Sequence, residues 1–146
     1  MAELNPGHTP QVTPPRSFSQ PKLIPVILKL KESYGTWQNC LAHFPKASRF
    51  TLGTKIDDVF LVAIEYCFLA SYSQIAEKIV LLDRCISRVD LLKLLVELSW
   101  DNRALDGKKY AAISEQLFEV GRMLGGWRRQ LANKTPETGS REKKEQ

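Results

Sequence analysis

The chain has 146 residues, the usual size of a single domain, so a multidomain enzyme is not expected. Apolar residues make up 43% and charged residues 25%, and no apolar run approaches the roughly 18 to 20 residues of a membrane-spanning helix. The first residues lack the pattern of a secretory signal, so we expect a soluble cytoplasmic protein with no membrane association. Three cysteines without a CxxC motif or paired histidines predict neither a disulfide framework nor a metal site.

The chain is basic, with 21 Lys and Arg against 16 Asp and Glu and a net charge of +5. Residues 1–22 and 133–146 each contribute +1, which leaves +3 for the segment between them. This balance favours polyanionic partners without identifying one.

Both ends of the chain have compositions typical of disorder. Six of the eight prolines lie within the first 25 residues, where they favour extended backbone, so residues 1–21 are predicted to form a disordered Pro-rich arm. Residues 133–146 contain no large apolar side chain and are predicted to form a disordered charged tail. The predicted domain is therefore 22–132.

Within that domain, apolar residues recur at spacings of three and four, the period of an amphipathic helix. The first stripe predicts a helix over about 23–43 and consists of Leu23, Ile27, Leu30, Tyr34, Trp37, Leu41 and Phe44. A second stripe follows Pro45, which suits a first helical turn, and predicts a helix over about 46–70.

Two further helices complete the pattern. Ser71 and Gln74 have the spacing of a capping box and predict the start of a helix over about 72–102. Asp106 is the predicted N-cap of a helix over about 107–131. Four long helices joined by short loops predict an all-α fold, an antiparallel up-and-down four-helix bundle.

Residues 59–70 of the second helix are apolar on nearly every face, with Glu65 as their single charge. Such a helix must be covered on more than one side, whereas a lone four-helix bundle covers one. A subunit interface is the favoured interpretation, and a broad core face with some exposed apolar surface is the alternative.

No catalytic constellation is present, so an enzyme is not predicted. His43 stands beside Phe44 and Pro45 at a predicted helix end, where a loop or packing role is favoured over general-base chemistry. Asp83, Asp90 and Glu97 recur at seven-residue spacing, but the Glu-x-x-His pairs of a di-metal bundle are missing, so a solvated stripe is favoured. No glycine-rich phosphate loop or cofactor motif occurs.

Basic residues do concentrate, at the corner between the first two helices, on the third helix and in the last turns of the fourth. Arginine suits phosphate because its planar fork makes paired bonds. Solvation, or interaction with a helix dipole, is the alternative at each position. The candidate nucleic-acid-binding residues are Lys46, Arg49, Lys55, Arg84, Arg88, Arg122, Arg128 and Arg129.

Two strings carry a family resemblance. FPKASRFTLGTKI, residues 44–56, and EVGRMLGGW, residues 119–127, resemble segments of the four-helix-bundle family that contains the accessory variability determinant (Avd) proteins of diversity-generating retroelements. The resemblance covers residues 23–131. Related bundle proteins are encoded in intervening sequences of bacterial ribosomal RNA genes.

The glycines of the second string also have a physical interpretation. Each helical glycine costs about 1 kcal/mol relative to alanine, so Gly121 and Gly125 are expected to permit close helix packing. A C-cap formed by Gly125 and Gly126 is the alternative. Continuation is favoured because Trp127 and Leu131 keep the apolar period.

The resemblance implies a homopentamer of bundles that binds nucleic acid and the reverse transcriptase of the retroelement. The protein would be a non-enzymatic subunit that positions template RNA or complementary DNA, or both, while the polymerase copies. The alternatives are a bundle associated with ribosomal RNA and a protein-interaction adaptor.

Overall fold

The computed structural model describes residues 24–134, so the predicted arm and all but the first two residues of the predicted tail lie outside the described part. Four long helices dominate this part of the chain, and it contains no strand. The elements are α1 (Pro25–Leu41), α2 (Lys46–Ser48), the π-helical segment η1 (Arg49–Gly53), α3 (Thr54–Tyr72), α4 (Ile75–Asp101) and α5 (Gly107–Asn133).

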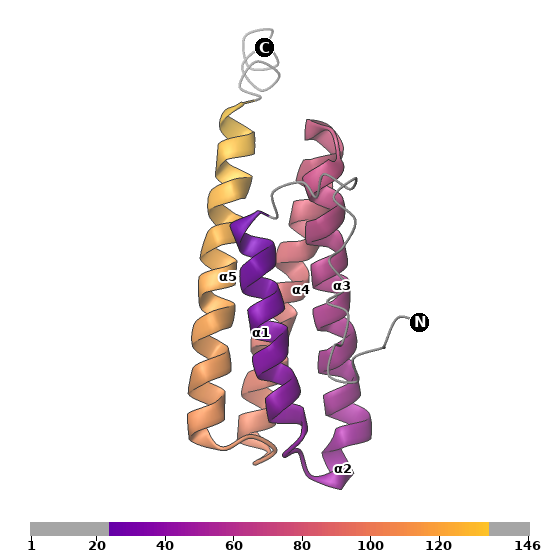
Figure 1. The fold of residues 1–146 in the computed structure, drawn as a ribbon, viewed down its shortest axis with the longest axis vertical. Coiled ribbons are helices and arrows are strands. Elements are labelled where there is room, and N and C mark those ends of the chain that lie inside the picture. Colours follow the sequence, from indigo (N-terminus) through magenta and orange to yellow (C-terminus); the bar gives the residue numbers. More distant parts are fainter. Residues whose placement is uncertain (1–23, 135–146) are drawn as a thin grey trace, which may run out of the picture.

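The long helices lie side by side and alternate in direction, as Figure 1 shows. α3 packs on α4, α4 on α5, and α1 closes the ring by contacting both α5 and α3. The α1–α2 corner and the α4–α5 loop lie at one end of the bundle, and the α3–α4 turn lies at the other (Figure 1). The predicted antiparallel four-helix bundle is confirmed.

Helix boundaries differ from the predictions mainly where caps were inferred. α1 begins at Pro25, because proline at a first helical position removes a backbone donor that would have no helical partner. The predicted capping box is wrong: Ser71 lies inside α3, where its hydroxyl donates to the carbonyl of Phe68. Gln74 is the N-cap of α4 and makes no side-chain cap. The predicted N-cap Asp106 is confirmed, since its carboxylate accepts from the backbone N–H of Lys109 at 2.8 Å.

The predicted helix over 46–70 is interrupted by the wider turn of η1. A π-helical turn inserts an extra residue into a helix, and here it lies directly beneath the end of α1. Gly53 is buried at its last position, where an added Cβ would lie 2.8 Å from Leu41 Cδ1 and 3.5 Å from Phe44 Cδ2. Any larger residue at this position would therefore require the Leu41 side chain to shift.

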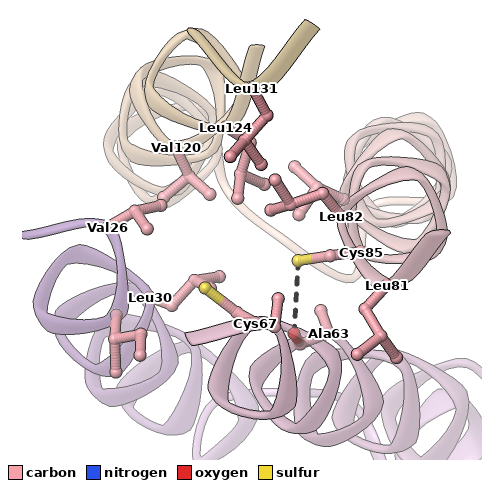
Figure 2. Close-up of a cluster of buried hydrophobic side chains, with 13 residues drawn as sticks. Val26, Leu30, Ala63, Cys67, Leu81, Leu82, Cys85, Val120, Leu124 and Leu131 are labelled. Carbon is pink, nitrogen blue, oxygen red and sulfur yellow. Dashed lines mark hydrogen bonds between the residues drawn. The ribbon is translucent and has the colours of Figure 1, made fainter. Parts of the chain in front are cut away.

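Two apolar clusters fill the interior. One, shown in Figure 2, contains Leu30, Cys67, Leu82 and Leu124, one residue from each of the four long helices. The other surrounds Trp37, which meets Phe44 edge to face at a centroid distance of 5.3 Å. The periodic stripes of the sequence supply most of both clusters.

The three cysteines are buried and free. Cys85 donates from Sγ to the carbonyl of Ala63 at 3.3 Å (Figure 2). Hydrogen bonding with Cys67 and burial both raise the pKa of Cys85, so its thiol stays protonated at neutral pH. The cysteines act as small apolar core residues. No described helix is long and apolar enough to cross a bilayer.

Two polar links tie α1 to its neighbours. On the α3 side, Oδ1 of Asp57 accepts from Tyr34 at 2.9 Å, from Trp37 Nε1 at 3.3 Å and from Gln38 at 2.8 Å. On the α5 side, Lys29 pairs with Glu119 at 3.3 Å, and this interaction raises the pKa of the lysine. Together these links hold α1 between α3 and α5.

Candidate nucleic-acid interface

A groove runs along the outer surface between α3 and α4, and we call it the α3–α4 groove. It has a volume of about 390 Å³ and is lined by Tyr66, Arg84, Ser87, Arg88 and Leu91. Arg84 and Arg88 are four residues apart on α4 and therefore share a face of that helix. Neither arginine has an acidic partner within ion-pair distance among the described residues. Two guanidinium groups that are not paired with carboxylates can bind a phosphate group by donating hydrogen bonds to its oxygens.

The three arginines of α5 differ in their surroundings. Arg122 and Arg129 are exposed and form no ion pair within the described part of the chain. Arg128 instead donates from Nε to Asp83 of α4 at 2.8 Å. The Arg128 guanidinium is thus already paired with a carboxylate, and this ion pair links α5 to α4.

At the α1–α2 corner, Lys46 and Lys55 are exposed, but Arg49 is half-buried. Its guanidinium donates to the carbonyl of Phe44 at 3.2 Å and to that of Ala42 at 3.4 Å. These carbonyls lie just past the end of α1, so Arg49 satisfies backbone acceptors that the helix leaves open. Arg49 therefore has a structural role here.

The candidate basic residues do not converge on one patch. Arg84 and Arg88 lie on the flank of α4 that meets Tyr66 of α3, whereas Asp83 lies on the flank of α4 that meets Arg128 of α5. The corner residues lie at one end of the bundle (Figure 1). The structure thus separates them into three groups: the α3–α4 groove, the surface of α5, and the end of the bundle.

The helix-packing candidates in α5 also differ from one another. α5 continues through Gly125 and Gly126, so the C-cap alternative is excluded. An added Cβ at Gly121 would lie 2.7 Å from Lys93 Nζ, which places the end of a flexible α4 side chain against this glycine. At Gly125, by contrast, the nearest atom is Arg129 Nη1 of the same helix at 3.9 Å. Trp127 is half-buried and packs against the first core cluster.

Sequence reasoning assigned no role to Trp100, at the end of α4. Its ring stacks on Tyr110 with a centroid distance of 4.6 Å and an interplanar angle of 9°. Trp100 lies four residues after Val96 and so keeps the apolar spacing of its helix, which is typical of a core residue. Only the basic residues Arg103 and Lys108 beside it could have indicated a role outside the core.

The described residues support neither a metal site nor general-base chemistry at His43. They contain no group of three His, Cys, Asp or Glu side chains that could hold a metal ion. Asp83 is paired with Arg128 and Asp90 with Lys93 at 3.5 Å, so two of the three spaced acids serve separate surface ion pairs. His43 is exposed in the turn after α1, and its Nδ1 lies 3.0 Å from the carbonyl of Asn39, four residues earlier.

Fold and surface together define a four-helix-bundle protein with exposed arginines that have no ion-pair partner in the described part of the chain. A family model described as bAvd-like matches residues 29–131, well over half of the chain. The chain belongs to this bAvd-like family and is thus an Avd-type accessory protein. A comparison with curated proteins gave no match.

Proposed function

We propose that this protein is a non-enzymatic, cytoplasmic subunit of a diversity-generating retroelement. It binds template RNA, complementary DNA or both, together with the reverse transcriptase of the element, and it works as a homo-oligomer, most simply a pentamer. Membership of the bAvd-like family supports the retroelement context. Because the protein positions nucleic acid for the polymerase, it needs no catalytic residue or cofactor of its own.

The observation that carries the nucleic-acid proposal is the α3–α4 groove. Arg84 and Arg88 occupy the same helix face and have no acidic partner among the described residues, and Tyr66 supplies an aromatic wall. A guanidinium left without a carboxylate retains its donors for phosphate oxygens. Phosphate contacts position a strand but do not read its sequence, so binding is expected to be sequence-tolerant.

Assembly would strengthen this interaction. The segment between residues 22 and 133 carries +3, so five copies bring together roughly +15. Counterion release then makes affinity strongly dependent on salt. This dependence provides the direct test.

The test replaces Arg84, Arg88, Arg122 and Arg129 with glutamine, which keeps much of each side chain and deletes the charge. Arg49 and Arg128 are left intact because each makes a structural contact. Wild type should retain mixed-sequence RNA or DNA at low salt, with the logarithm of affinity falling linearly against the logarithm of salt. The variant should bind more weakly and with a shallower slope, by roughly 0.7 to 0.9 for each phosphate that it no longer neutralises.

A matched control addresses net charge alone. The pair Lys31→Gln and Lys78→Gln removes the same charge as Arg84→Gln and Arg88→Gln, but from positions outside the groove. The control pair should lose less affinity than the groove pair, with helicity and mass unchanged in both.

If wild type retains no nucleic acid at low salt, the adaptor alternative is the better account. If the four substitutions leave binding intact, Lys46, Lys55, Lys108, Lys109 and Arg128 are the next candidates.

The partner is tested separately. When the cognate reverse transcriptase is supplied, the four-arginine variant should support less mutagenic copying of a template RNA than wild type does. A reverse transcriptase gene with a template and variable repeat pair beside this gene would support the retroelement context. Location inside a ribosomal RNA gene would support the ribosomal alternative.

A further inference from the structure

The end of α4 carries an aromatic pair that lies partly outside the core. Trp100 and Tyr110 lie nearly parallel at 4.6 Å, one from α4 and one from α5. Tyr110 is half-buried against the second core cluster, whereas Trp100 is 46% exposed. That exposure is consistent with one face of the indole lying on Tyr110 and the other facing solvent.

The surroundings leave the indole open. At Gly107 an added Cβ would meet Trp100 Nε1 at 4.0 Å, so the absence of a side chain there keeps the edge of the ring uncovered. Since Tyr110 is anchored in the bundle, the tryptophan is held in place before any ligand arrives. A fixed, half-exposed aromatic face suits stacking of a planar ring.

The adjoining turn presents positive charge. Arg103 has φ of 61°, an uncommon conformation for a residue with a side chain, and its N–H donates to the carbonyl of Trp100 at 2.9 Å. Arg103 and Lys108 are exposed and lack ion pairs within the described chain, whereas Lys109 is paired with the N-cap Asp106 at 3.4 Å. Asp101 is the remaining acid of the turn, so residues 100–110 keep a net charge of +1.

We propose that Trp100 is a stacking platform for an unpaired nucleobase, with Arg103 and Lys108 contacting the flanking phosphates. The proposal rests on the nucleic-acid binding argued above and adds a preference for single strands. Bases in a duplex have their faces covered by their neighbours, whereas an unpaired base can lie flat on an aromatic side chain. Every base has such a face, so the platform tolerates any sequence.

The experiment compares a labelled oligouridine with an abasic ribose-phosphate oligomer of the same length, both measured by fluorescence anisotropy at one salt concentration. Wild type should bind oligouridine about 5- to 150-fold more tightly than the abasic probe. Trp100→Leu should abolish this ratio while leaving affinity for the abasic probe unchanged. Phe118→Leu is the matched control, because Phe118 is an exposed α5 aromatic outside the pair, and it should leave the ratio intact.

The outcomes separate the two proposals. Equal wild-type affinity for both probes, or a ratio that survives Trp100→Leu, overturns the platform while leaving phosphate binding in place. No binding of either probe at low salt overturns both. Circular dichroism checks that Trp100→Leu folds. Arg103→Gly provides a second test, because glycine adopts the positive φ readily, so the substitution removes the charged side chain without straining the turn. It should weaken binding of both probes equally, and unchanged affinity for both would remove the phosphate role of Arg103.

Discussion

Single residues in this bundle gain their roles from what lies across the helix interface. Asp57 shows this most clearly, because one carboxylate oxygen on α3 accepts from three side chains of α1. Trp37 is fully buried, and its indole N–H donates to this carboxylate at 3.3 Å. The carboxylate thus connects the packing of an aromatic core residue to the position of a whole helix.

Asp57→Ala should destabilise the bundle by about 1 to 3 kcal/mol, because it leaves the buried indole donor unpaired. Tyr34→Phe removes one donor and leaves no buried group unsatisfied, so its cost should be smaller, about 0.5 to 1.5 kcal/mol. Urea unfolding of both variants measures the difference. Equal costs would mean that the Trp37 bond contributes nothing.

Tyr34 should also make the stability of the bundle depend on pH in the alkaline range. Burial and the hydrogen bond to Asp57 raise the pKa of its phenol in the folded state. The stability that the neutral Tyr34 phenol contributes is therefore fully present below its unfolded-state pKa of about 10. This contribution is lost as pH rises through the higher pKa of the folded state. The Tyr34→Phe variant should lose less stability than wild type over this alkaline range.

At the scale of elements, the glycines divide according to their neighbours and not according to helix propensity. Gly53 ends the π-helical segment against Leu41 and Phe44, whereas Gly125 lies mid-helix with open space on most sides. The residues next to each glycine in the sequence do not predict this difference. It arises because α1 packs against η1 at Gly53, whereas no other helix approaches Gly125 closely.

Gly53→Ala should destabilise the protein by about 1 to 3 kcal/mol, because its Cβ would overlap Leu41 in a packed corner. Gly125→Ala should stabilise it by up to about 1 kcal/mol, because alanine is the better helix former and meets no close neighbour. Thermal unfolding of the two variants should show melting temperatures that shift in opposite directions. Shifts of the same sign would contradict the steric distinction.

Gly121→Leu tests the packing of α5 on α4. The added side chain would displace Lys93 from its contacts with Asp90 and with the ring of Phe118, 4.8 Å from the ammonium. A destabilisation of about 1 to 3 kcal/mol is expected, because the larger side chain would push Lys93 out of both contacts. Gly121→Ala is the control and should be nearly neutral, because the end of a lysine can give way. An unchanged melting temperature for the leucine variant would remove the packing role of Gly121.

For the whole molecule, the outer surface of the α3–α4 pair mixes apolar and basic residues. Val80, Leu94 and Leu98 of α4 are exposed, as are Leu61, Phe68 and Leu69 from the apolar segment of α3. Large exposed apolar side chains gathered on neighbouring helices are typical of a surface that another subunit covers. We therefore expect assembly to cover these apolar residues and to leave the adjoining α3–α4 groove open to nucleic acid.

Light scattering should give a mass several times 16.6 kDa for wild type, with five copies expected from the family resemblance. Leu94→Glu combined with Leu98→Glu should shift the mass toward that of one chain, because a buried interface does not tolerate unpaired carboxylates. Leu28→Glu, a change at a comparably exposed position on α1, is the control and should leave the mass unchanged. A monodisperse wild-type monomer at micromolar concentration would defeat the assembly proposal.

The sequence by itself determined the four helices, their antiparallel order and most of the core, because each apolar stripe needs only local periodicity to be recognised. The N-cap at Asp106 was also predictable, since a cap is made within one helical turn. The motifs at residues 44–56 and 119–127 likewise indicated the family before the fold was considered.

Only the tertiary structure decided which charges are free and which aromatic groups meet. Arg49 contacts carbonyls beyond the end of α1, and Arg128 contacts Asp83 across 45 residues, so sequence spacing could not distinguish them from Arg84 and Arg88. Trp100 and Tyr110 are brought together by the α4–α5 turn. Helical periodicity reports which face of one helix is apolar, whereas contacts between side chains depend on how two helices are placed against each other.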